Sequence, residues 1–134
     1  GGGVAAPQNG KYPTICERRD WHNLKVDEKV VALRAAGFDV AVNVRIARFP
    51  SLPSSYAVAD YIARAPGSTP RNSIYYLGEV KTGDADLTPN QRVNYYSGLT
   101  QIRSSNAAHI GLLKNEVIPV IWKGVDRFPG CPSK

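Results

Sequence analysis

Residues 74–82 give the strongest strand signal in the chain, and the charges within them limit the fold most. The segment reads Ile-Tyr-Tyr-Leu-Gly-Glu-Val-Lys-Thr, and aromatic and β-branched residues of this kind favour an extended backbone. Successive side chains of a strand point to opposite faces, so Glu79 and Lys81 share one face while Val80 belongs to the other. A carboxylate and an ammonium group must therefore lie on one face of a sheet.

The residues before this strand predict a helix and two further strands. Apolar steps of three and four residues indicate a helix over 23–36 or 27–36, and Gly37 suits the left-handed position that ends many helices. Alternation of side-chain type indicates strands over 40–46 and about 56–64. One face of the first strand is expected to hold Val40, Val42, Val44 and Ile46. One face of the second is expected to hold Tyr56, Val58, Asp60 and Ile62.

The residues after it predict a second helix and a last strand. Thr-Pro-Asn-Gln at 88–91 has the residue types of a helix N-cap with a capping box. The apolar stripe expected for that helix consists of Val93, Tyr96, Leu99 and Ile102. Residues 117–122 indicate a strand in which Pro119 favours an edge or a bulge. Residues 109–113 fit either a strand or a short helix.

This order of elements predicts an α/β fold with a central mixed β-sheet flanked by helices. With 134 residues the chain has the size of one domain, which we expect at 15–134. Residues 1–14 lack periodicity and are expected to be a linker from a larger polypeptide. No apolar run approaches the ~20 residues of a transmembrane helix, so no role in a membrane is expected. Cys16 and Cys131 could form a disulfide or remain two free thiols.

Asp60 is the single charge on a strand face that is otherwise expected to be apolar, and a buried carboxylate needs a compensating partner. If strands 56–64 and 74–82 pair antiparallel, they lie about 4.8 Å apart, and the carboxylates of Asp60 and Glu79 can converge on one ion. Oxygen ligands suit a hard divalent cation such as Mg²⁺ or Mn²⁺. Lys81 beside this ion is placed to position a water and to offset negative charge on a phosphate.

Three features in this order resemble the PD-(D/E)XK, or restriction-endonuclease-like, nuclease superfamily over roughly residues 27–122. They are Asp60 on one strand, Gly-Glu-Val-Lys-Thr-Gly at 78–83 on the next, and Leu-Thr-Pro-Asn-Gln at 87–91 at the start of a helix. The resemblance implies a restriction-endonuclease-like core and a nuclease activity that depends on a divalent metal. Ala59 departs from the motif, which commonly has proline before the aspartate.

The resemblance also assigns roles to individual residues. The implied catalytic residues are Asp60, Glu79, Lys81 and Gln91. The implied metal ligands are Asp60, Glu79 and the backbone carbonyl of Val80. Glu28, on the first helix, is the additional acidic residue that some members have. Mg²⁺ is the expected cofactor, with Mn²⁺ and Zn²⁺ as alternatives.

The charge of the chain favours a polyanionic partner. Its 17 Lys and Arg against 11 Asp and Glu give a net charge of +6, which suits nucleic acid once the cations gather around the site. One member of each Tyr-Tyr pair is expected to face outward, where it can stack on a base. The expected nucleic-acid contacts are Arg45, Arg64, Arg92 and Tyr95. His22 and His109 lack the spacing of a zinc site and are expected to be surface or structural residues.

These observations predict a metal-dependent nuclease that hydrolyses phosphodiester bonds of DNA or tRNA. A basic domain led by a linker resembles the C-terminal toxin domain of a larger secreted bacterial protein, delivered into the cytoplasm of a target cell. That resemblance implies an acidic immunity protein as partner. Two alternatives stay open: a cytoplasmic restriction or repair nuclease acting on host DNA, and a nucleic-acid-binding module without catalytic activity. The sequence does not distinguish DNA from RNA as the substrate.

Overall fold

The computed structural model describes residues 16–50, 56–95, 98–105 and 107–132. Its two α-helices and five strands include all the helices and strands expected from the sequence and one strand, β4, that was not expected. In chain order the elements are α1 (Arg18–Ala35), β1 (Asp39–Arg48), β2 (Ala57–Arg64), β3 (Tyr75–Thr82), α2 (Pro89–Asn94), β4 (Gln101–Ser104), the 3₁₀-helix η1 (Ala108–Ile110) and β5 (Val117–Phe128).

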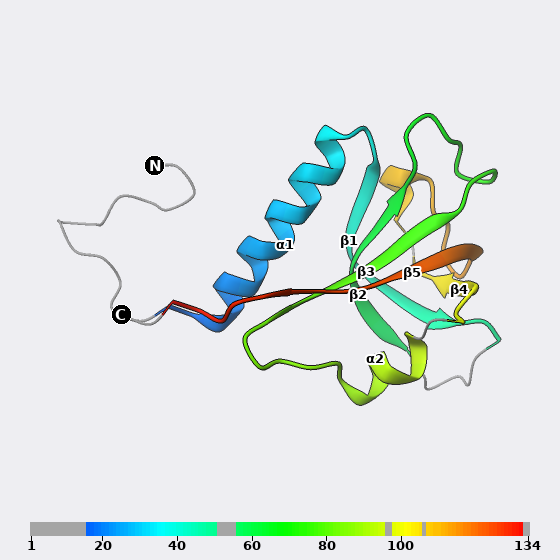
Figure 1. Cartoon of the computed structure of the whole chain (residues 1–134). Coiled ribbons are helices and arrows are strands. Elements are labelled where there is room, and N and C mark those ends of the chain that lie inside the picture. Colours follow the sequence, from blue (N-terminus) through cyan, green and yellow to red (C-terminus); the bar gives the residue numbers. More distant parts are fainter. Residues whose placement is uncertain (1–15, 51–55, 96–97, 106, 133–134) are drawn as a thin grey trace.

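The five strands form a mixed sheet that closes into a barrel in the order β1-β2-β3-β5-β4 (Figure 1). β3 and β5 run parallel, and the other neighbouring pairs are antiparallel. The prediction of an α/β fold with a mixed sheet is confirmed. Closure of the sheet was not predicted, because it depends on β4 pairing with both β1 and β5.

The expected apolar stripe after α2 is wrong. The helix ends at Asn94, Val93 is exposed, and Ile102 is buried in β4 instead. Burial alternates along β4 with the period of a strand, and Gly98 just before it is unfavourable inside a helix. Tyr96 lies outside the described residues. The stripe therefore combined residues of two elements with different periods.

Helix α1 covers one face of the sheet and begins earlier than expected. Val26 and Val30 pack against side chains of β1, β2 and β3, among them Val80, while the other face of the strands lines the barrel interior. The helix has no side-chain hydrogen bond at its N-cap, Glu17, so the usual sequence signal for a helix start is missing. Gly37 has φ +94°, the left-handed conformation expected after the last turn.

The predicted faces of the first two strands are wrong in part, because the alternation shifts at Asn43. Ala41 faces the barrel interior before this residue and Val44 faces it afterwards, whereas Val42 is exposed. Asn43 has φ +53°, a conformation that Asn adopts more readily than most residues. Of the residues expected on the two apolar faces, Val42, Tyr56 and Val58 are exposed.

β2 makes the same shift at the residue opposite Asn43. The pairs Val42 with Tyr61 and Val44 with Ala59 flank this point, and the residue between them on β2 is Asp60. Ala59, Asp60 and Tyr61 are all buried, so β2 has no exposed face there. Asp60 thus lies buried at the point where both strands change their side-chain alternation. It does not share an apolar face with Tyr56 and Val58.

β5 is longer than expected and lies between β3 and β4. Pro119 pairs with β4 one residue before the pairing with β3 begins at Val120, a position where β5 has a single neighbour, as expected for proline. Residues 109–113 form no strand: the last two residues of η1 lead into a turn at Gly111. No helix among the described residues combines the length and the apolar character needed to cross a membrane.

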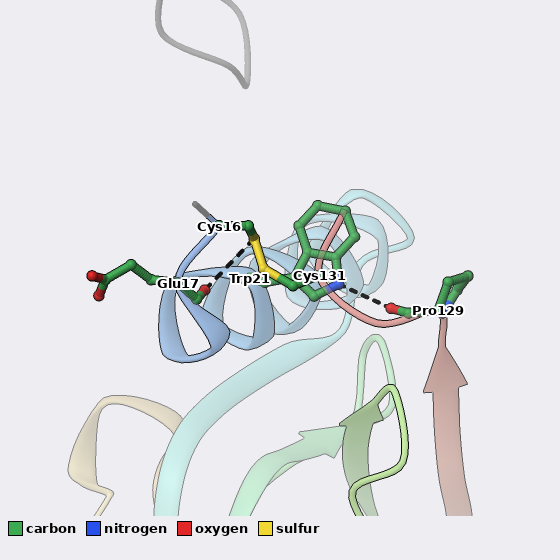
Figure 2. The surroundings of a disulfide bond; sticks show 5 residues. All are labelled: Cys16, Glu17, Trp21, Pro129 and Cys131. Atoms are coloured by element: carbon green, nitrogen blue, oxygen red, sulfur yellow. Dashed lines mark hydrogen bonds between the residues drawn. A yellow bond between two sulfur atoms is a disulfide. The ribbon is translucent and has the colours of Figure 1, made fainter. Parts of the chain in front are cut away.

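A disulfide between Cys16 and Cys131 joins the two ends of the described chain across 115 residues (Figure 2). The indole Nε1 of Trp21 in α1 also donates to the carbonyl of Pro129, 2.9 Å away. The segment after β5 consequently runs back to the first turn of α1 (Figure 1). Of the two alternatives left open by the sequence, the structure has the disulfide.

Candidate active site

The carboxylates of Asp60 and Glu79 lie together where β2 pairs with β3, and we call them the carboxylate pair. Their residues are 7% and 2% exposed. The backbone N–H of Val80 donates to Oδ2 of Asp60 at 2.7 Å, and the N–H of Asp60 donates to Oε1 of Glu79 at 3.4 Å. Each carboxylate therefore accepts a hydrogen bond from the backbone of the other strand, which holds the two groups close together.

Gln91 links the carboxylate pair to the start of α2. Its Oε1 accepts from the N–H of Thr88 at 2.9 Å, and its own N–H donates to Oγ1 of Thr88 at 3.2 Å, which confirms the predicted capping box. Its Nε2 donates to Oε2 of Glu79 at 3.1 Å. The side-chain amide of Gln91 thus caps the start of α2 with its oxygen and orients the buried Glu79 carboxylate with its nitrogen.

The negative charge of the carboxylate pair has little compensation from the protein. Among the described residues, no Lys or Arg forms an ion pair with Asp60 or Glu79. Burial raises the pKa of Glu79 well above its usual range, and the hydrogen bond to Asp60 and repulsion by that carboxylate raise it further, while the charge of Lys81 opposes them. The carboxylate pair therefore holds a proton more readily than two separate carboxylates would.

The hydroxyl of Tyr95 is a further buried polar group near Glu79. Tyr95 is 4% exposed, and within the described chain its hydroxyl has no hydrogen-bond partner. Its ring stacks on Trp122 with centroids 4.4 Å apart, so it is not presented to solvent as expected for stacking on a base. Burial and the neighbouring Glu79 carboxylate raise the pKa of Tyr95. The hydroxyl nevertheless lies close enough to the Glu79 carboxylate to lower the pKa of that carboxylate.

His22 belongs to this site, although the sequence indicated a surface or structural residue. Helix α1 places its Nε2 3.3 Å from Oδ2 of Asp60 and 3.0 Å from the carbonyl oxygen of Val80. The sequence contains one signal for this position: His22 is four residues before Val26 and eight before Val30, so all three lie on the face of α1 that packs on the sheet. Because the expected helix begins after His22, the pattern expected for it does not extend to this residue.

Lys81 and His22 line an open groove of about 780 Å³, which we call the basic groove. Its lining residues include Arg18, Arg19, His22, Lys81, Asp84 and Cys131. Arg18 and Arg19 are exposed and Lys81 is partly exposed. The first turn of α1, the end of β3 and the disulfide-bonded segment thus form a mainly cationic surface beside the carboxylate pair.

Two residues predicted for the site are engaged elsewhere. The carboxylate of Glu28 pairs with Lys25 at 3.2 Å, and its side chain is 53% exposed; the structure does not bring it to the carboxylate pair. Arg64 is buried at the end of β2, where its guanidinium pairs with Asp39 at 2.8 Å and also donates to the carbonyl of Ser68. Its side chain is not presented to a nucleic acid.

The other two arginines expected to contact nucleic acid are exposed but lie outside the basic groove. Arg92 pairs with Asp86 at 2.8 Å. Arg45 lies over the ring of Tyr56, 4.2 Å from its centroid, in a second groove of about 320 Å³ that Arg103 also lines. The sequence did not single out Arg18 and Arg19, because nothing local shows that their helix turn meets the end of β3.

The residues at the site fit a hard divalent cation. The donors are carboxylate and carbonyl oxygens, and no Lys or Arg of the described chain pairs with the two buried carboxylates. No three His, Cys, Asp or Glu side chains are grouped as a metal centre in the described part of the chain. The atoms that do converge are Oδ2 of Asp60, the carbonyl oxygen of Val80 and Nε2 of His22.

Comparison of the chain with protein-family models, with curated proteins and with solved structures gives no match.

Proposed function

We propose that this protein is a divalent-metal-dependent nuclease with a restriction-endonuclease-like core. The observation that carries the proposal is the carboxylate pair: two buried carboxylates without a Lys or Arg partner, next to Lys81 in a basic groove. Burying such charges costs free energy, so their presence favours a functional role over a structural one. The order of α1, a mixed sheet and α2 also agrees with the core that the motif implies.

In this reaction water adds across a phosphodiester bond. A bond forms between the water oxygen and phosphorus, the bond from phosphorus to the leaving oxygen breaks, the leaving oxygen gains a proton, and the proton lost by the water passes to solvent. Asp60, Glu79 and the carbonyl of Val80 would hold the cation, which lowers the pKa of bound water and offsets charge on the phosphate. Lys81 donates to phosphate oxygens, and Gln91 keeps Glu79 oriented.

The basic groove is the proposed route for the substrate. It leads to Lys81 and His22 and has two exposed arginines on its α1 side, and a nucleic-acid backbone needs cations spaced along its path. The substrate is DNA or tRNA. We further propose that the domain acts as a secreted antibacterial toxin in the cytoplasm of a target cell. An acidic immunity protein would then bind the basic groove by charge complementarity.

The direct test is incubation of the purified protein with plasmid, genomic DNA and total tRNA, each with Mg²⁺, Mn²⁺, Zn²⁺ or excess EDTA. We expect cleavage with a metal and none in EDTA. Asp60→Asn should abolish it, and Lys81→Ala should slow single-turnover cleavage about 100-fold or more. The control is Lys114→Ala, an exposed lysine expected to leave the rate unchanged.

Three outcomes would contradict the proposal in different ways. Cleavage in excess EDTA would exclude metal dependence, and wild-type cleavage by Lys81→Ala would remove the role of the lysine. Binding of nucleic acid without cleavage under any metal would favour a binding module. Cleavage of tRNA alone would instead agree with the proposal and exclude the alternative of a restriction or repair nuclease that acts on DNA.

A further inference from the structure

We propose that His22 is a ligand of the catalytic cation, so that the centre has a nitrogen donor beside its oxygens. This inference rests on the proposed function, because it concerns the metal of the same site. It goes beyond the motif, whose ligands are two carboxylates and a carbonyl.

The distances around Nε2 of His22 support a ligand role. Bonds of about 2.0 to 2.2 Å to a metal place neighbouring ligands roughly 3.0 Å apart at right angles and about 3.4 Å apart in a tetrahedron. Nε2 lies 3.0 Å from the carbonyl oxygen of Val80 and 3.3 Å from Oδ2 of Asp60. Nε2, from α1, is thus separated from one oxygen of β2 and one of β3 by the distances expected between adjacent ligands.

The position of His22 in the molecule also suits a ligand. Its side chain is 31% exposed and lines the basic groove, so an ion can reach it from solvent. The first turn of α1 is held by the disulfide at Cys16 and by the hydrogen bond from Trp21 to Pro129 (Figure 2). A ligand needs such support, because small displacements weaken a metal site.

A nitrogen donor changes which ions the site prefers. Imidazole binds Zn²⁺, Co²⁺ and Ni²⁺ well, whereas Mg²⁺ prefers oxygen ligands and retains its waters. The His22 proposal therefore predicts that Zn²⁺ and Co²⁺ bind more tightly than Mg²⁺, and that this preference depends on one imidazole. A site with oxygen ligands alone would show a smaller difference between its affinities for Zn²⁺ or Co²⁺ and for Mg²⁺.

The test compares metal binding by the wild type, His22→Gln and His22→Ala, with titration calorimetry for ZnCl₂ and MgCl₂ and visible absorption for CoCl₂. Gln keeps a hydrogen-bond donor but removes the imidazole. We expect both variants to lose at least tenfold in affinity for Zn²⁺ and Co²⁺, to lose the nitrogen-ligand contribution to the Co²⁺ spectrum, and to keep Mg²⁺ affinity within about threefold. Both cysteines are disulfide-bonded, so omitting reductant keeps thiols from competing.

His109→Gln is the matched control, because His109 is exposed in η1 and should not affect any metal. Near-ultraviolet circular dichroism of each metal-free variant checks that the fold is retained. Wild-type Zn²⁺ affinity in a folded His22→Gln protein would overturn the proposal, and so would a wild type that binds neither Zn²⁺ nor Co²⁺. Nuclease activity with unchanged metal binding in His22→Gln would refute only the ligand role. If His22→Gln loses Zn²⁺ binding while the wild type binds Zn²⁺ but cleaves no nucleic acid, only the proposed function would be refuted.

Discussion

Glu79 is the residue at which function and stability conflict most clearly. Its carboxylate is buried beside Asp60, and both circumstances disfavour its charged form. Glu79→Gln keeps the shape of the side chain and removes the charge; its oxygen can keep the 3.1 Å hydrogen bond from Gln91, at the loss of the longer 3.4 Å contact with the N–H of Asp60. We expect this change to abolish cleavage and to raise the free energy of unfolding of the metal-free protein at pH 7, on the order of 1 kcal/mol or more.

The pH dependence of this increase in the free energy of unfolding follows from the direction in which the pKa of Glu79 is shifted. The pKa of Glu79 is raised in the folded protein, so above the ordinary value of 4.5 the folded state holds a proton that the unfolded chain has lost. Wild-type stability therefore falls as the pH rises from 4.5 through the raised pKa. The gain of Glu79→Gln should be present at pH 7 and disappear below about pH 4.5. Urea unfolding in EDTA measures it, with the exposed Glu28→Gln as control, and a destabilised Glu79→Gln at pH 7 would indicate a structural carboxylate.

Among the elements, α2 depends most on a single contact. It has only six residues, too few to be stable without its cap and its packing. Thr88→Ala removes one side of the capping box and should cost about 1 kcal/mol, while the hydrogen bond from Gln91 to Glu79 remains available. Gln91→Ala should lower the free energy of unfolding by a similar amount, and it also removes the hydrogen bond that orients the Glu79 carboxylate.

The two variants therefore separate capping from orientation of the carboxylate. We expect cleavage by Thr88→Ala to stay within a few-fold of wild type and cleavage by Gln91→Ala to fall tenfold or more, at similar unfolding midpoints. Equal losses of activity in both would show that the position of the helix matters and that the amide of Gln91 does not. Single-turnover cleavage and urea unfolding of the same preparations provide both quantities.

The disulfide acts on the scale of the whole molecule, since it closes a loop over a separation of 115 residues. Loop-closure entropy predicts that replacing both cysteines, Cys16→Ser with Cys131→Ser, lowers the free energy of unfolding by roughly 4 to 5 kcal/mol. The double variant avoids leaving an unpaired thiol. Chemical unfolding without reductant is the measurement, and an unchanged midpoint would mean that the ends of the chain are held by other contacts, such as that of Trp21 with Pro129.

The placement of the substrate is also a property of the whole molecule. In an Asp60→Asn background, the logarithm of nucleic-acid affinity should fall linearly with the logarithm of salt concentration, with a slope of about −0.7 to −0.9 per neutralised phosphate. Arg18→Ala with Arg19→Ala should reduce the magnitude of this slope by about 1.5, for two lost phosphate contacts. Arg45→Ala with Arg103→Ala removes the same charge from the second groove and should change it little. The reverse result would assign the substrate to the second groove.

The sequence by itself determined the parts of this site that depend on near neighbours. Alternation along β3 placed Glu79 and Lys81 on one face and Val80 on the other, and residues 88–91 specified a capping box. The proximity of Asp60 and Glu79 followed from one hairpin. The capping box and the proximity of Asp60 and Glu79 are confirmed, because each rests on residues close in sequence or on a single connection between two strands.

The tertiary structure alone decided what comes to this pair from elsewhere. His22 reaches Asp60 and Val80 across separations of 38 and 58 residues, and the disulfide brings Cys131 to the basic groove. The change of side-chain alternation at Asn43 and the closure of the barrel by β4 were likewise decided by the tertiary structure. Each depends on which surfaces the whole chain buries together, and hydrophobic burial is not directional. Local periodicity therefore identifies the elements and their faces but not which of those faces meet.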